Sequence, residues 1–118
     1  MNGQASESAS GSDLTLEDLQ GLIDNAQEAA GFLKALGHDG RLTILCHLCA
    51  GPRTVTELES LLMSRQAIVS QQLARLRLEG LVSARREGQI IYYSILDPKV
   101  EKVVRLLAAL WDGNARKS

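Results

Sequence analysis

The segment from Val55 to Leu96 constrains the fold of this chain more than any other. Its first part, VTELESLLMSRQAIVSQQLARLRLEG, has the pattern of two helices joined by a short turn at Met63 to Arg65. Its second part, LVSARREGQIIYYSIL, alternates as the two strands of a hairpin do. We therefore expect a helix-turn-helix that is followed directly by a two-stranded hairpin.

The second helix of this pair has an apolar side and a largely polar side. Val69, Leu73 and Leu76 repeat at the spacing that lines one face of a helix. The residues on its other faces are Gln66, Ala67, Ser70, Gln71 and Arg75. Gln and Arg can each form paired hydrogen bonds with one base in the major groove of DNA. The pattern therefore predicts a helix that reads DNA.

The hairpin is predicted to carry a basic tip. Val82, Ala84, Ile90, Tyr92 and Ser94 alternate with their neighbours along the two strands. The tip contains Arg85, Arg86, Glu87, Gly88 and Gln89, in which Gly88 can adopt the positive φ of a tight turn. A basic hairpin next to a reading helix is typical of a DNA-binding wing.

The charge distribution favours nucleic-acid binding, although the net charge is −1. Residues 1–33 contain six acidic residues and no Lys or Arg, which leaves 13 basic against 8 acidic residues, a net charge of +5, in the remainder. Residues 65–86 contain five Arg and one acidic residue, Glu79. This positive segment coincides with the predicted reading surface. The alternative interpretation is a solvated, charged helix face.

Three pieces of the sequence occur in the order seen in one known family. They are AAGFLKALGHDGRLTILCHL, SQQLARLRLEGLV and RREGQIIYYSI, and the similarity covers about residues 14–111. The chain resembles the ArsR/SmtB family of bacterial transcriptional repressors. The resemblance implies a mainly α fold with a small β-hairpin, a winged helix-turn-helix that dimerises through its N- and C-terminal helices and binds an inverted-repeat operator in double-stranded DNA.

The resemblance also implies which residues contact DNA. The positions that match family contacts are Gln66, Ala67, Ser70 and Gln71 in the helix, with Arg85, Arg86 and Gln89 in the wing. Many relatives have a hydroxyl where Ala67 stands, and Arg65 is the residue that could compensate for it. Met63 stands where the family usually has Gly, and a methionine in a left-handed turn would cost about 1 kcal/mol or more.

The flanking segments complete a domain predicted at residues 13–113. Residues 1–12 are a disordered polar tail in this prediction, and residues 114–118 are a C-terminal tail. Thr15 and Asp18 resemble a capping box that opens one long helix to about Leu36. A short helix from Arg41 to Cys49 and a C-terminal helix beginning near Pro98 are also expected. Apolar stripes on both flanking helices favour a homodimer.

The chain carries few features of other protein classes. Its 118 residues include no nucleophile paired with a base, no carboxylate pair and no phosphate-binding loop, so an enzyme is not expected. No apolar run approaches the roughly 18 residues of a membrane span, and the N-terminus lacks a signal pattern, so we expect a cytoplasmic protein without a cofactor.

Cys46 and Cys49 are the candidate sensing residues. They lie at the C-terminal end of their predicted helix, where the helix dipole opposes thiolate formation, so a thioredoxin-like activity is not expected. RLTILCHL is similar to members that repress sulfide-oxidation and biofilm genes, in which a cysteine at the position of Cys46 pairs with one near the end of the C-terminal helix. Leu110 to Gly113 contain no cysteine, which leaves Cys49 as the available partner for a disulfide or polysulfide link.

Several alternatives remain at this point. Both cysteines could be buried small hydrophobes in an effector-independent repressor, and the chain also resembles the rhizobial nodulation regulator. A metal-responsive repressor would need Cys46, Cys49 and His38 or His47 as ligands, but the usual family ligands are missing, so no metal site is predicted. His47 is expected at the surface and His38 in a turn. A dimeric interaction module without DNA binding is the alternative from another class.

Overall fold

The computed structural model describes residues 13–112. Both predicted tails, residues 1–12 and 114–118, lie outside the described residues. The chain divides into two units, residues 1–33 and 34–118, each of which is described by itself. The elements in chain order are α2 (Leu16–Asp24), α3 (Ala26–Leu36), α4 (Asp39–Cys49), α5 (Val55–Leu62), α6 (Gln66–Leu78), β1 (Val82–Glu87), β2 (Ile90–Ile95) and α7 (Pro98–Leu110).

Residues 16–36 form two helices, α2 and α3, where one long helix was predicted. The capping box at the start of α2 is confirmed: the Thr15 hydroxyl accepts from the backbone N–H of Asp18 at 3.0 Å, and the Thr15 N–H donates to the Asp18 carboxylate at 3.1 Å. The helix then ends at Asp24, because Asn25 leaves the helical conformation with φ −111° and ψ 25°. The Asn25 amide donates to the carbonyl of Gly21 at 2.8 Å, and such local side-chain bonding competes with helix continuation.

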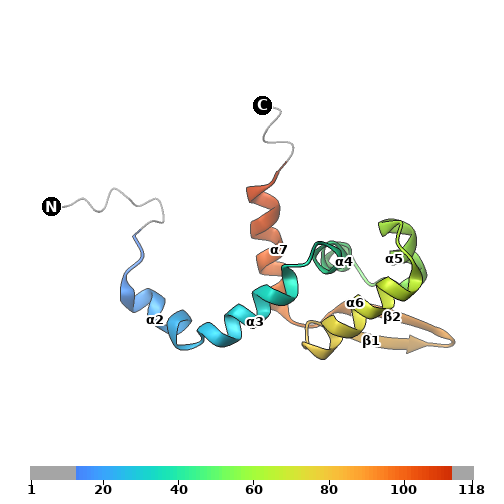
Figure 1. Ribbon diagram of the computed structural model, residues 1–118, viewed down its shortest axis with the longest axis horizontal. Helices are drawn as coiled ribbons and strands as arrows, with labels where there is room; N and C mark the ends of the chain where they lie inside the picture. The colour runs from blue at the N-terminus through green and yellow to red at the C-terminus, as the bar shows by residue number, and fades with distance from the viewer. Residues whose placement is uncertain (1–12, 113–118) are drawn as a thin grey trace. The chain divides into compact units, whose positions relative to one another are not determined.

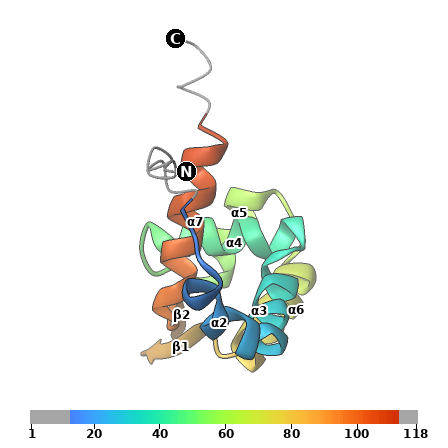
Figure 2. The same cartoon turned by 90° about the vertical axis from the view of Figure 1, so that its left-hand side faces the viewer.

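The second unit is built around α4. Figures 1 and 2 show α4 between α7 on one side and α5 and α6 on the other, with the hairpin below. Its core comes from every element of this unit except β2. The buried hydrophobic residues are Ala35, Leu36, Ile44, Leu45, Leu48, Leu58, Val69, Leu73, Leu76, Leu81, Val82 and Val100.

The helix α4 starts two residues earlier than predicted. His38 is its N-cap residue, and the imidazole Nδ1 accepts from the backbone N–H of Gly40 at 3.1 Å. Imidazole is absent from the short list of preferred N-cap side chains, which explains why the sequence pattern placed the start at Arg41. Leu45 and Leu48 are buried as predicted, but Leu42 is half-buried and Ile44 takes the remaining core position.

The helix-turn-helix of α5 and α6 is confirmed. A capping box between Thr54 and Glu57 starts α5. Met63 ends it in the left-handed conformation, with φ 51° and ψ 45°. The Ser64 N–H donates to the Glu59 carbonyl at 3.1 Å and the Met63 N–H to the Ser60 carbonyl at 3.3 Å, which is the Schellman pattern. The turn that normally uses Gly is therefore made with an exposed methionine.

The hairpin has a tight turn and is joined at its base to the chain before α5. Glu87 pairs with Ile90, and the intervening turn residues are Gly88, with φ 66°, and Gln89. A positive φ at the first turn position alone is the pattern of a type II′ turn. Arg53 forms an isolated bridge with Tyr93, with reciprocal N–H to carbonyl distances of 3.0 and 2.8 Å. A short third strand segment thus ties the hairpin to the start of the helix-turn-helix.

The C-terminal helix α7 exposes much of its apolar surface. The helix begins at Pro98, as predicted, and Asp97 is its N-cap residue. Val100 is buried against the core, whereas Leu106, Leu110 and Trp111 are exposed. In the part of the chain that the structure describes, no helix has the length and apolar character needed to cross a membrane.

Candidate nucleic-acid interface

The helix α6 presents its polar residues to solvent while its apolar seam anchors it. Val69, Leu73 and Leu76 are at most 1% exposed, as predicted. Gln66, Ala67, Ser70 and Gln71 are all exposed. Among the described residues, the side chains of Gln66, Ser70 and Gln71 have no hydrogen-bond partner, so their donors and acceptors are available to a ligand. Because the buried seam anchors α6 to the core, the positions of these exposed groups on the surface are defined.

The N-terminus of α6 is uncapped by a side chain. Arg65 is the N-cap residue and makes no side-chain cap hydrogen bond. The first N–H groups of a helix have no partner within the helix, and together with the helix dipole they favour an anion such as a phosphate. Arg65 itself is exposed and has no ion pair within residues 13–112.

Arg75 and Arg77, near the C-terminal end of α6, differ in whether they form an ion pair. Arg75 forms an i,i+4 ion pair with Glu79, with 3.1 Å between Nε and the carboxylate oxygen. This partly exposed pair offsets the positive charge of a residue that the sequence assigned to DNA contact. Arg77 is exposed and, within the described part of the chain, makes no ion pair. The sequence pattern counted Arg77 as part of the basic segment but did not single it out as a contact.

The two wing arginines lie on opposite faces of the hairpin. Arg85 is held on one face, where Nη2 lies 2.8 Å from the Glu87 carboxylate and the guanidinium carbon lies 5.7 Å from the centroid of the Tyr92 ring. Arg86 is on the other face opposite Ile91 and is exposed, and it has no ion pair or hydrogen bond among the described residues. Glu87 and Gln89 are also exposed near the tip. The sequence treated the two arginines as equivalent, because periodicity alone does not reveal which one has an acidic neighbour.

The cysteines are both free thiols at the end of α4. Cys46 is exposed and Cys49 is half-buried, so the interpretation of both as buried hydrophobes is wrong for Cys46. Burial raises the pKa of both thiols above the ordinary value. The pKa of Cys49 is raised further by the neighbouring Cys46 and by Glu101 of α7, while Arg105 acts in the opposite direction. At neutral pH both residues are therefore mostly protonated thiols.

The histidines have ordinary structural environments. His38 caps α4 as described above, and His47 is half-buried rather than a plain surface residue. Within residues 13–112, no three His, Cys, Asp or Glu side chains are grouped closely enough to hold a metal ion.

The structure also contains a bond near the reading surface that the sequence did not predict. Arg41 of α4 donates from Nη1 to the Gln72 amide oxygen of α6 at 3.1 Å. Gln72 lies beside Gln71 in the sequence but is only partly exposed. The two partners are 31 positions apart. No local pattern of residue types could have paired them.

Comparison with known proteins gives consistent matches over most of the chain. Residues 38–84 match the family described as bacterial regulatory protein, arsR family. The chain is 38% identical over 94 residues to the transcriptional activator HlyU of Vibrio cholerae, covering 80% of this chain and 87% of that protein. It is 39% identical over 93 residues to the biofilm growth-associated repressor of Agrobacterium fabrum, covering 79% and 80%. The crystal structure of the transcriptional repressor BigR from Xylella fastidiosa superposes with a TM-score of 0.74 at 36% identity, covering 82% of this chain and 96% of BigR.

Proposed function

Because this chain belongs to the arsR family of bacterial regulatory proteins, and is a DNA-binding transcriptional regulator rather than an enzyme, we propose that it represses transcription by binding an inverted-repeat operator as a homodimer. Its place of action is then the bacterial cytoplasm, where the chromosome lies. The proposal rests on one observation. The side chains of Gln66, Ser70 and Gln71 are exposed and make no hydrogen bond among the described residues, while the apolar seam of the same helix is buried.

The helix α6 enters the major groove in this proposal. Gln66 and Gln71 offer paired donors and acceptors to adenine, and Ser70 can bond either a donor or an acceptor on a base edge. Ala67 provides a methyl group that can contact a thymine methyl. The uncapped N-terminus of α6 and the Arg65 guanidinium bind backbone phosphates, which fix the register of the helix but carry no sequence information. Arg75 can add a phosphate contact only in competition with Glu79.

In this proposal Arg86 contributes more to DNA binding by the wing than Arg85 does. Arg86 is free to enter the adjacent minor groove, together with Gln89 at the turn. Arg85 contributes less, because Glu87 already neutralises its charge and Tyr92 covers one face of its guanidinium group. The contact set predicted from the sequence is thereby ranked, with Arg86 above Arg85 and Gln71 above Arg75.

Dimerisation follows from apolar surface that the described residues leave uncovered. Leu106 and Leu110 of α7 and the C-cap residue Trp111 are 58%, 64% and 69% exposed, which is unusual for large apolar side chains so close together. A second copy of the chain would bury this surface, and twofold symmetry would place the two α6 helices about one DNA turn apart. Sedimentation equilibrium should therefore give the mass of a dimer, and Leu110→Lys should shift it toward the monomer.

The DNA contacts are tested with matched glutamine variants. An operator is first selected from random duplexes with the wild-type protein, and binding is then measured by gel shift. Gln71→Ala should weaken operator binding by about 1 to 3 kcal/mol with little effect on the fold. Gln27→Ala removes an exposed glutamine from α3 and serves as the control. Equal binding by wild type and Gln71→Ala would remove Gln71 from the reading surface, and failure to select any operator would overturn the proposed function.

Release from DNA is proposed to occur through the two thiols. The Cys46 thiolate attacks an S–S bond of a polysulfide, takes one sulfur as a persulfide, and the shortened polysulfide leaves. The Cys49 thiolate then attacks Cys46 Sγ, the two Sγ atoms bond, and hydrosulfide leaves with the two electrons lost by the thiols. Residues three apart on a helix have Cβ atoms about 5 to 6 Å apart, whereas a disulfide needs about 3.5 to 4.5 Å. The link therefore distorts the end of α4, which supports α5 and α6.

The thiol proposal is tested with cysteine variants of the intact protein. Polysulfide should release wild-type protein from its operator and lower its mass by that of two hydrogen atoms. Cys46→Ser and Cys49→Ser should each stay bound under the same treatment. If both variants dissociate as readily as wild type, the thiols do not control DNA binding and the regulator acts without them.

A further inference from the structure

One hydrogen bond near the reading helix differs from the others in its span. Apart from Arg41 to Gln72, every side-chain hydrogen bond among residues 14–111 joins groups within seven positions of one another along the chain. Arg41 and Gln72 are 31 positions apart and join α4 to α6 at 3.1 Å. Both groups are part-buried, so this charged donor is less screened than the surface ion pairs.

The same guanidinium group is fixed at its other side by the end of α3. Arg41 Nε donates to the carbonyl of Ala35 at 2.7 Å, and Nη2 lies 3.3 Å from the carbonyl of Lys34. These carbonyls belong to the last turn of a helix that ends at Leu36, where the dipole attracts a cation. The Lys34 carbonyl also accepts from the backbone N–H of Gly37 at 3.2 Å. Arg41 therefore connects the end of α3 to α6 through three hydrogen bonds.

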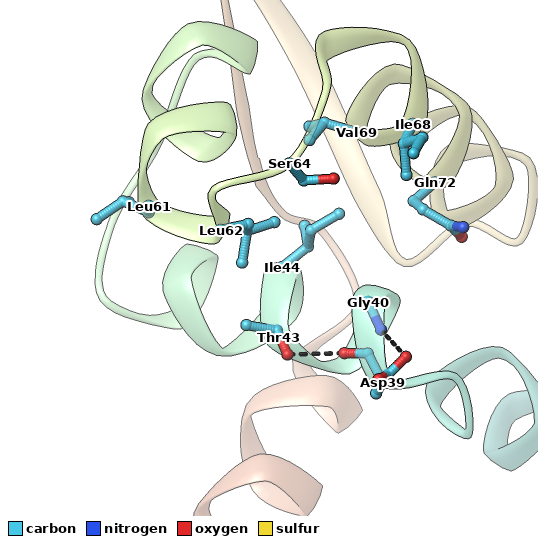
Figure 3. A pocket seen from close by; sticks show the side chains of 10 residues that line it. All are labelled: Asp39, Gly40, Thr43, Ile44, Leu61, Leu62, Ser64, Ile68, Val69 and Gln72. Atoms are coloured by element: carbon cyan, nitrogen blue, oxygen red, sulfur yellow. Dashed lines mark hydrogen bonds between the residues drawn. The ribbon is translucent and has the colours of Figure 1, made fainter.

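A hollow between α4, α5 and α6 makes this connection important for the orientation of α6. Figure 3 shows the hollow, of about 350 Å³, with Ile68 and Gln72 of α6 on one side and Thr43 of α4 across from them. The seam of Val69, Leu73 and Leu76 is buried beside the hollow, which Val69 also lines, but Ile68 stays 47% exposed. On the side of the hollow, α6 is therefore packed less closely than along the seam, and the Arg41–Gln72 hydrogen bond adds a polar contact there.

The geometry of Gln72 determines what it can contribute. Arg41 can only donate, so the Gln72 amide oxygen must accept the bond and its NH₂ group points elsewhere. Gln72 follows Gln71 directly, so a rotation of α6 that moves one also moves the other. A small rotation would displace Gln66, Ser70 and Gln71 from the base edges, since direct readout needs hydrogen bonds of about 2.7 to 3.2 Å.

We propose that Arg41 is a positioning residue that fixes the rotation of α6, and hence the specificity of base recognition, by tying Gln72 to the C-terminal carbonyls of α3. The proposal rests on the function proposed above, in which α6 reads DNA. It assigns no DNA contact to Arg41 or Gln72. Loss of the bond should weaken operator binding, while binding to unrelated DNA, which depends on phosphate contacts, should be retained.

The test compares operator and scrambled duplexes over a series of salt concentrations by fluorescence anisotropy. Gln72→Met keeps the length of the side chain and leaves the bonds from Arg41 to Ala35 and Lys34 in place. We expect it to lower the ratio of operator to scrambled affinity about five- to tenfold, in the range of one lost base contact, with an unchanged salt slope. Gln72→Glu retains an acceptor for Arg41, so its ratio should stay close to that of wild type even if its added negative charge weakens both complexes.

Arg41→Met and the double variant provide the coupling measurement. If Gln72 acts through Arg41, adding Gln72→Met to Arg41→Met should lower the ratio no further. Lys102→Met, which removes an exposed positive charge from α7, is the control for charge. Thermal unfolding of each variant identifies any loss of folded protein, and Gln72→Met leaves the test valid if Arg41→Met unfolds.

Distinct results would overturn the proposal. A ratio within twofold of wild type in Gln72→Met would show that the bond does not set specificity. Additive losses in the double variant would mean that Gln72 contacts DNA itself. A salt slope reduced by about one in Arg41→Met, but not in Lys102→Met, would make Arg41 a phosphate contact instead. A wild-type protein that prefers no duplex would overturn the proposed function and this role of Arg41 with it.

Discussion

Replacing Met63 by glycine should stabilise the protein. Met63 holds φ 51° and ψ 45° at the end of α5, and its side chain is 92% exposed. A left-handed conformation costs a residue with a Cβ atom roughly 1 to 2 kcal/mol. Glycine avoids that cost but gains freedom in the unfolded chain, which offsets roughly 0.4 to 1 kcal/mol. Because an exposed side chain gives up little buried surface, we expect a net gain of about 0.5 to 1 kcal/mol.

The assay is thermal and urea unfolding followed by circular dichroism at one fixed protein concentration, since a dimer's stability depends on concentration. For a domain of this size the gain corresponds to a rise in Tm of about 2 to 6 °C. Met63→Ala is the matched control, because it removes the same side chain but keeps the Cβ atom and therefore the strain. If Met63→Gly is no more stable than Met63→Ala, the turn is not strained in the way its φ indicates.

Three further predictions concern the wing, the cap of α4 and the thiols. Arg86→Ala should weaken operator binding about tenfold or more, whereas Arg85→Ala should have a smaller effect because Glu87 already pairs with Arg85 at 2.8 Å; comparable losses in a gel-shift titration would contradict this ranking. His38→Ala should lower the free energy of unfolding in urea by about 0.5 to 2 kcal/mol, because the cap of α4 is lost. His38→Ser should retain most of the wild-type stability, since serine also accepts from the first-turn N–H groups. Equal stability of the two variants would exclude a capping role. Burial raises the pKa of Cys46 and Cys49, so their thiolate fraction at neutral pH is below that of a free thiol and increases only at more alkaline pH. Iodoacetamide should therefore label the folded protein more slowly than the urea-unfolded protein between pH 7 and 8. Equal labelling rates would refute the shift in pKa.

The parts of the fold that the sequence predicted correctly are those set by local patterns. The seam of Val69, Leu73 and Leu76 has the period of a helix, and the wing has alternation and a glycine at its turn, so both were found without any tertiary information. From the sequence, Met63 in place of the usual glycine left open whether the turn differs or stores strain, and the structure shows the left-handed conformation there.

The features that the sequence missed depend on contacts or on local competition. Asn25 breaks the predicted long helix by bonding the Gly21 carbonyl, although the apolar stripe continues past it. The pairing of Arg85 with Glu87 and of Arg41 with Gln72 needs knowledge of which side chains meet in space. The candidate DNA contacts were predicted as a set, but their relative importance depends on these partners.

The bridge between Arg53 and Tyr93 has a mechanical consequence for operator choice. Two backbone hydrogen bonds anchor the middle of β2 to Arg53, which precedes the N-cap residue of α5, so a displacement of the wing is transmitted to the helix-turn-helix. In the proposed DNA complex, α6 and the hairpin then move together as one rigid unit. Each half-site of the proposed operator should accordingly keep a constant number of base pairs between the bases read by α6 and those beneath the wing. A single base pair inserted there should abolish binding by one protomer of the proposed dimer.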